Sequence, residues 1–200
     1  MRIMAKSTSM LLVFLCVSVI YTGCSSEMTY FSLDEIKIDE NGQFCGASFQ
    51  FGGTVAQTEE MLRTDLQPHM QTDSVEVFTT KQNSASLSNQ TTPFYLEFKD
   101  NRLFSVYTTW ESSGTSSPAP SESDFDTLYE HAVELFGNPT TSKLNEPLIA
   151  PDGTDFGISI TEYIWIRETE ESITQLHLVM DKQDNNINLI SLIMNTRTPD

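Results

Sequence analysis

The chain has few cysteines and therefore little scope for disulfide bonds. It contains 3 cysteines in 200 residues, and two of them, Cys16 and Cys24, fall in the N-terminal segment discussed below. Small secreted domains often depend on several disulfides. Here Cys45 stands alone in the rest of the chain, so the fold has to be held together by packing. We expect Cys45 to be a buried structural thiol.

Basic residues are also scarce, with 11 Lys and Arg against 28 Asp and Glu, a formal net charge of −17. Loss of residues 1–23 would remove Arg2 and Lys6 and take this charge from −17 to −19. Such an acidic chain repels the phosphates of nucleic acids and of anionic lipids. We therefore expect no nucleic-acid partner, whereas a cationic partner stays open.

Residue patterns typical of catalysis are missing as well. The 3 histidines, His69, His131 and His177, are scattered, and neither HExxH nor Gly-x-Ser-x-Gly occurs. Asp184-x-Asn186-x-Asn188 has the first ligand spacing of a calcium loop but lacks its glycine and its final acid. We expect no metal site, no cofactor and no catalytic residues.

No apolar run is long enough for a stable membrane span. Leu11–Ile20, broken only by Ser18, follows Arg2 and Lys6. This run has about ten residues, whereas a spanning helix needs roughly 20. A basic start followed by a short apolar core is typical of an export signal, which we predict over residues 1–23.

The tetrapeptide Tyr21-Thr22-Gly23-Cys24 follows this run directly. It resembles the lipobox of bacterial lipoproteins, in which the signal is cleaved before a cysteine that becomes acylated. Thr22, Gly23 and Cys24 match the motif, while Tyr21 stands where leucine is usual. The resemblance implies lipidation of Cys24, a tether over residues 24–33, and attachment outside the cytoplasm to the cell membrane or the outer membrane.

Residues 34–111 predict a first α+β unit. Asn41-Gly42 lies between two β-prone runs and predicts a hairpin. Thr54, with Gln57 three residues later, predicts a capped helix from about Val55 to Leu66, which Pro68 would end. Strands are expected at about 74–80, 94–99 and 103–110, with a loop over 81–92.

A Ser/Pro-rich linker over 112–123 precedes a second predicted α+β unit, 124–200. Ser123 is its expected helix cap and Gly137 its helix end. A loop carrying Pro147 is expected next, then strands at 158–168, 172–180 and 187–194. One apolar stripe marks the helix: Phe125, Leu128, Ala132, Leu135 and Phe136.

Together these patterns predict an α+β fold in which antiparallel sheet carries one packed helix in each half, as possible tandem units. Gly52-Gly53-Thr54, Leu135–Pro139 and the turn at 98–103 lie where helices and hairpins begin or end. In this arrangement the chain resembles the tandem helix–sheet domains of β-lactamase-inhibitor proteins and the single unit of small outer-membrane-assembly lipoproteins. The resemblance implies binding of proteins or peptides on an open sheet face.

Aromatic side chains alternate along the strand expected at 158–168. Tyr163, Trp165 and Arg167 would share one face, with Ile164 and Ile166 on the other. If the isoleucines pack on the helix, the Tyr–Trp–Arg face points outward and offers residue types that dominate protein interfaces. In the alternative, the aromatic face is the core. Tyr163, Trp165 and Arg167 are our candidate partner-binding residues.

The sequence thus predicts a lipid-anchored extracytoplasmic bacterial protein that binds another protein or peptide and has no chemistry of its own. Two alternatives stay open. A small envelope hydrolase predicts a pocket that gathers His131 or His177 with acids, and a small-ligand-binding lipoprotein predicts a closed apolar cavity.

Overall fold

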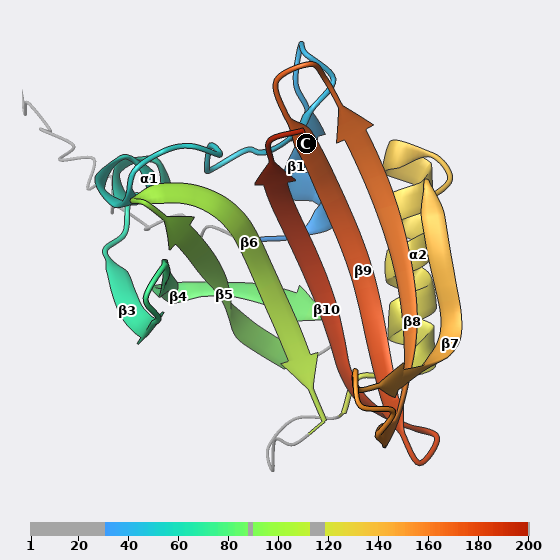
Figure 1. Ribbon diagram of the computed structural model, residues 1–200. Helices are drawn as coiled ribbons and strands as arrows, with labels where there is room; N and C mark the ends of the chain where they lie inside the picture. Colours follow the sequence, from blue (N-terminus) through green and yellow to red (C-terminus); the bar gives the residue numbers. More distant parts are fainter. Residues whose placement is uncertain (1–30, 88–89, 113–118, 200) are drawn as a thin grey trace, which may run out of the picture.

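The computed structural model describes residues 31–87, 90–112 and 119–199. The predicted signal, Cys24 and much of the Ser/Pro-rich segment lie outside these ranges. Within them the fold is mostly antiparallel β-sheet, with a separate two-stranded hairpin and two α-helices (Figure 1). No helix in these ranges is long and apolar enough to cross a membrane.

Both halves of the chain contribute to one eight-stranded sheet with the order β3-β4-β5-β6-β10-β9-β8-β7. Strands β6 and β10 join the halves, pairing antiparallel from Leu189 opposite Glu111 to Asn195 opposite Ser105. Each half is a meander of consecutive strands, and every pairing in the sheet, including that of β6 with β10, is antiparallel. The strands are β3 Leu66–Gln71, β4 Val75–Leu87, β5 Gln90–Lys99, β6 Arg102–Glu111, β7 Thr141–Ile149, β8 Asp155–Glu168, β9 Ile173–Gln183 and β10 Asn186–Arg197.

The hairpin predicted around Asn41-Gly42 is confirmed. A short 3-10 helix, Leu33–Glu35, leads into β1 Ile36–Ile38, which pairs with β2 Phe44–Gly46. Gly42 has φ 78°, a conformation that costs glycine little. The Asp39 carboxylate accepts hydrogen bonds from the backbone N–H groups of Asn41 and Gln43, both at 2.9 Å, and so holds the turn.

Helix α1 begins as predicted but ends early. It spans Val55–Leu62, and Thr54 and Gln57 form the expected capping box. Arg63 follows in the left-handed conformation, with φ 52°. Leu66 already belongs to β3, and Pro68 lies within that strand rather than ending the helix. Pro68 is tolerated because β3 is an edge strand, where a missing N–H interrupts no ladder on the outer side.

Helix α2 spans Glu122–Phe136, and its cap is Ser121 rather than the predicted Ser123. The Ser121 hydroxyl accepts from the Asp124 N–H, and the Asp124 carboxylate accepts from the Ser121 N–H at 2.8 Å. The helix ends at Gly137, as predicted. Of its apolar stripe, Phe125, Ala132 and Phe136 are buried, but Leu135 is 42% exposed.

Two segments expected as loops are strands. The range 81–92 contains the end of β4 and the start of β5, and the segment after Gly137 contains β7. Every residue of β7 is exposed, so it shows no alternation of apolar and polar residues. Such strands form because a neighbouring strand offers backbone partners, which the sequence pattern does not reveal.

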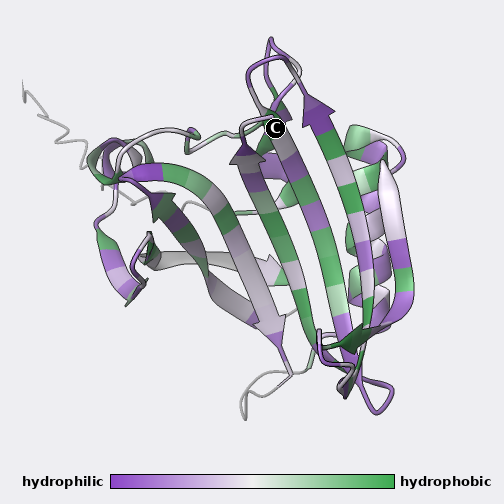
Figure 2. Cartoon of the chain, in the orientation of Figure 1, coloured by the Kyte–Doolittle hydropathy of each residue, from purple (hydrophilic) through white to green (hydrophobic). Residues whose placement is uncertain are grey.

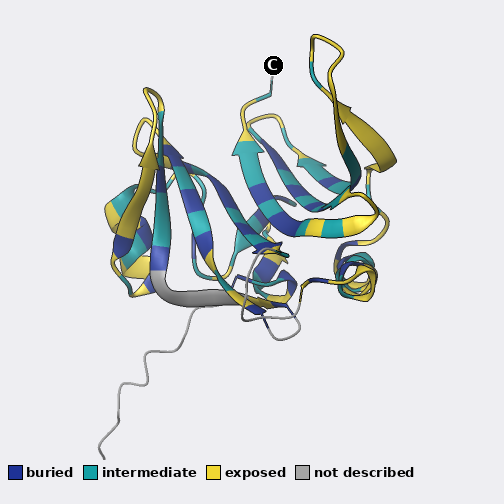
Figure 3. Cartoon of the chain, turned by 90° about the horizontal axis from the view of Figure 1, so that it is seen from below, coloured by how far each residue is buried: buried dark blue, intermediate teal, exposed yellow. Residues whose placement is uncertain are grey.

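A single apolar cluster holds both halves and both helices against one side of the sheet. Phe98 and Leu103 from the first half, and Leu176 and Leu192 from the second, are each at most 1% exposed. Alternate residues face the other side, so β9 and β10 show bands of both hydropathy colours in Figure 2. In Figure 3 both helices lie on the outer side of the bent sheet. The opposite side, which we call the open face, carries no described helix.

Candidate binding face

The residues proposed from the sequence for partner binding face the core, so the expected outward orientation of Tyr163, Trp165 and Arg167 is wrong. Trp165 is 0% exposed, and its indole Nε1 donates to the carbonyl of Gly137 at 2.7 Å. Tyr163 stacks on Tyr129 of α2, with ring centroids 4.2 Å apart. The aromatic rings bury a large apolar area under the amphipathic helix, and the indole N–H finds an acceptor there.

Arg167 also contacts residues of the core side and not of the open face. Its guanidinium lies 5.3 Å from the centre of the Phe44 ring and donates to the carbonyl of Phe136 at 3.1 Å. It therefore ties the hairpin β1–β2 to the C-terminal end of α2. None of the three side chains is placed to form an exposed interface.

The open face instead presents a continuous row of side chains that crosses all eight strands. The row's centre is the stacked pair Tyr95 and Tyr107, with centroids 5.0 Å apart, followed by Ile193. All three are half-buried, because their neighbours are other strand residues and no described segment lies over them. From β3 to β7 the cross-strand partners are Gln67, Thr79, Tyr95, Tyr107, Ile193, His177, Ile164 and Thr141.

His69 adds a further ring at the β3 end of this row. It lies in the irregular part of β3 between Pro68 and Met70, and its ring centroid is 5.0 Å from that of Tyr95. His69 lies two residues after Gln67, so the alternation of side chains along β3 places both on the open face.

Ionisable groups cluster on the open face near β7. Glu162 accepts a hydrogen bond from His177 Nδ1 at 2.8 Å and one from Lys143 Nζ at 2.9 Å. Burial alone would raise the pKa of Glu162, but these two hydrogen bonds outweigh it and hold the pKa below its usual value. The same carboxylate raises the pKa of Lys143. Glu162 is therefore ionised and its charge is already compensated within the chain.

Acidic groups also gather where β6, β9 and β10 meet on this face. Asp181 lies near Glu111, and its Oδ1 accepts the backbone N–H of Leu189 at 3.1 Å beside the irregularity in β10. Burial, followed by repulsion from Glu111, raises the pKa of Asp181 despite that hydrogen bond. The open face thus combines aromatic and aliphatic surface with negative charge.

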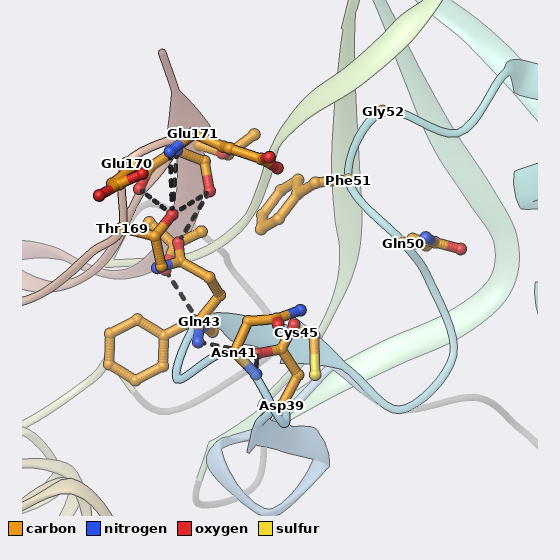
Figure 4. A pocket seen from close by; sticks show the side chains of 14 residues that line it. Asp39, Asn41, Gln43, Cys45, Gln50, Phe51, Gly52, Thr169, Glu170 and Glu171 are labelled. Atoms are coloured by element: carbon orange, nitrogen blue, oxygen red, sulfur yellow. Dashed lines mark hydrogen bonds between the residues drawn. The ribbon is translucent and has the colours of Figure 1, made fainter. Parts of the chain in front are cut away.

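A hollow lies on the other side of the molecule from the open face, between the hairpin β1–β2 and the turn that joins β8 to β9 (Figure 4). Its volume is about 770 Å³, and it is lined by acidic, amide and hydroxyl groups together with Phe44, Phe51 and Cys45, with no basic side chain among the described residues. Ser172 Oγ donates to Gln43 Oε1 at 3.1 Å across it. Gln43 Nε2 has no hydrogen-bond partner among the described residues, but it is shielded from solvent and so from a ligand as well.

Cys45 lines this hollow and is only partly buried, not the fully buried thiol expected. Burial, and then the nearby Asp39 charge, raise the pKa of its thiol. Its sulfur lies 3.7 Å from the carbonyl of Lys37. A raised pKa disfavours the nucleophilic thiolate, so these surroundings do not activate Cys45.

His131 lines neither the open-face row nor this hollow, and it connects α2 to the N-terminal 3-10 helix. Its Nε2 is 2.9 Å from Asp34 Oδ1, and its Nδ1 is 3.7 Å from Glu134 Oε2. Glu134 is three residues from His131 on the same helix, whereas Asp34 is 97 residues away in the chain.

Comparison of the chain with protein-family models, curated proteins and solved structures finds no match. The function proposed for this chain therefore depends on its own residues alone.

Proposed function

We propose that this chain is a lipid-anchored extracytoplasmic bacterial protein whose folded part binds another protein or peptide through the open face. The basic start, the short apolar run and the lipobox-like YTGC support the anchor on Cys24. Durable attachment takes two or more acyl chains, which a single modified cysteine can carry. The membrane is then a partner through the lipid alone, because the chain's negative charge repels anionic headgroups.

The observation that carries the binding role is the uncovered row of Tyr95, Tyr107 and Ile193 at the centre of the eight-stranded sheet. Tyrosine offers a large, rigid contact area and a polar tip, and it is favoured where partners dock. A flat or concave sheet face with a mixture of aromatic, aliphatic and charged groups suits a folded protein or an extended peptide.

We further propose that the two halves are related units, each a helix followed by a four-stranded meander. The strand order supports this, because each meander runs from an edge strand to the centre of the sheet. The first runs from β3 to β6 and the second from β7 to β10. Helix α1 precedes the first meander and α2 the second. The tandem helix–sheet proteins that this arrangement resembles mostly bind proteins or peptides on the open sheet face.

Site-specific photocrosslinking in the native cell tests the binding role. A benzophenone amino acid at Tyr107 is expected to give discrete adducts, because that side chain lies on the open face. The control position is Glu130, which is exposed on α2 on the other side of the molecule. Adducts that are equally abundant and unspecific at both positions would contradict the proposed face.

The anchor has its own test. Cys24→Ala is expected to leave the precursor unprocessed or to release the protein from the membrane fraction. The mass of the mature N-terminal peptide is expected to include the acyl groups. An exported protein with an unmodified sulfur at Cys24 would refute the lipid anchor and leave the binding face to be judged separately.

A further inference from the structure

An apolar groove lies on the open face beside the edge strand β7. It has a volume of about 320 Å³ and sits between β7, β8 and β9. Ile160 and Val179 form its base, since they lie on the inner strands β8 and β9, and the apolar residues of β7 form its wall. The complete lining is Lys143, Glu146, Pro147, Leu148, Ile149, Ile160, Glu162 and Val179.

Large apolar side chains are exposed at this groove and on the adjoining start of β8. Leu148 is 38% exposed and Ile149 is 53% exposed, and Phe156 at the start of β8 is 52% exposed. Single exposed apolar residues are ordinary, but several large ones on one hairpin next to a groove are typical of a docking site.

The form of β7 favours recognition of a side chain over addition of a further strand. Its pairing with β8 is irregular between Lys143 and Glu146 and again between Pro147 and Ile149. Bulges and proline on an edge strand obstruct pairing with another chain. A partner is therefore received in the groove and not along the edge.

Charge restricts the partner further. Within the lining, Lys143 is paired with Glu162 at 2.9 Å, and Glu146 adds a second carboxylate. The whole chain carries a net charge of −17. A second copy of this chain would bring the same negative charge, whereas a basic segment meets complementary charge around an apolar pocket.

We propose that this groove receives an aliphatic side chain from a lysine- or arginine-rich segment of the protein partner. This inference rests on the proposed binding role of the open face, and it names the partner's chemistry at one end of that face. The apolar side chain fills the groove over Ile160 and Val179, and the flanking cations lie against Glu146, whose charge adds to the net negative charge of the chain.

The test uses the full chain without its signal and a fluorescein-labelled peptide with a central leucine flanked by lysines, followed by fluorescence anisotropy. Exchange of the central leucine for serine is expected to weaken binding about tenfold, since it removes the buried side chain. Leu148→Ala in the protein is expected to weaken it about fivefold. Leu144→Ala is the matched control, because Leu144 is 59% exposed on the same strand but does not line the groove.

The charge contribution is tested with Glu146→Gln against Glu168→Gln. Both variants lose one negative charge, and Glu168 lies at the far end of β8. Only Glu146→Gln is expected to weaken the lysine peptide, by about threefold at low salt.

The outcomes separate the groove from the wider face. If the leucine and serine peptides bind equally, the attraction is general charge and the groove assignment is overturned. If Tyr107→Ala abolishes binding while Leu148→Ala leaves it unchanged, the groove assignment fails and the binding role of the open face stands. If Tyr107 gives no specific crosslinks in the cell, the binding role itself fails.

Discussion

The loss of stability on replacement of Trp165 by phenylalanine tests which face of β8 packs in the core. The indole is 0% exposed, and it donates a hydrogen bond to the Gly137 carbonyl at the end of α2. Phenylalanine removes that donor and so loses one hydrogen bond, at a cost of about 0.5–1.5 kcal/mol. It also leaves a small cavity, which adds about 1 kcal/mol and keeps the total below the roughly 3–5 kcal/mol of a tryptophan-to-alanine change.

The expected loss in the free energy of unfolding is therefore about 1.5–2.5 kcal/mol. For a domain of this size, that corresponds to a fall of about 3–10 °C in the melting temperature. Equilibrium urea unfolding of the chain without its signal, followed by circular dichroism, gives the value directly. The control is Ile164→Thr on the open face of the same strand, with an expected cost of about 1 kcal/mol or less.

If Trp165 faced solvent instead, the stability losses of the two variants would rank in the opposite order. In that case Trp165→Phe changes the stability by no more than about 0.5 kcal/mol, while Ile164→Thr is the costly change. Such a result would refute the placement of the aromatic face under α2 and would return Tyr163, Trp165 and Arg167 to the list of interface candidates.

Three further predictions concern the helix cap and two carboxylates. Ser121→Ala is expected to lower the stability by about 1 kcal/mol, and Ser123→Ala by much less, in the same unfolding assay; equal losses contradict the cap assignment. The pKa of Glu162 is lowered in the fold, so its stabilising contribution is present above its unfolded pKa and is lost as the pH falls through the folded value. Glu162→Gln should therefore be less stable than the original at pH 7 and lose that deficit in acid. The pKa of Asp181 is raised in the fold, so its effect on stability is opposite to that of Glu162. Asp181 ionises at a lower pH in the unfolded chain than in the folded one, and its charge therefore destabilises the fold at pH 7. Asp181→Asn should thus be more stable at pH 7, with the gain vanishing below the unfolded pKa; a loss at pH 7 contradicts the unfavourable burial of the Asp181 charge beside Glu111.

Local patterns predicted those elements whose signals lie within a few residues. The turn at Asn41-Gly42, the capping box of Thr54 and Gln57 and the end of α2 at Gly137 are confirmed. Each depends on a backbone conformation or a hydrogen bond between near neighbours, so the rest of the fold changes it little. The end of α1 was misjudged, because Leu66 has a partner in β4 that the sequence pattern cannot show.

Segments expected as loops are the other difference between prediction and structure. All of β7 is exposed, and Pro147 within it predicts a loop. The strand forms because β8 supplies backbone groups for pairing, and it brings Leu148 and Ile149 to the rim of the groove. A groove lined by three strands has no signature in any one of them.

By itself, the sequence determined the acidic charge, the local turns and caps, and the alternation of Tyr163 and Trp165 with Ile164 along β8. A period of two defines two faces but does not state which one a helix will cover. Only the tertiary structure decided that α2 covers the aromatic face, because Trp165 finds the Gly137 carbonyl there and Tyr163 finds the Tyr129 ring. The same choice left Ile164, His177 and the Tyr95–Tyr107 pair on the open side, where we place the partner.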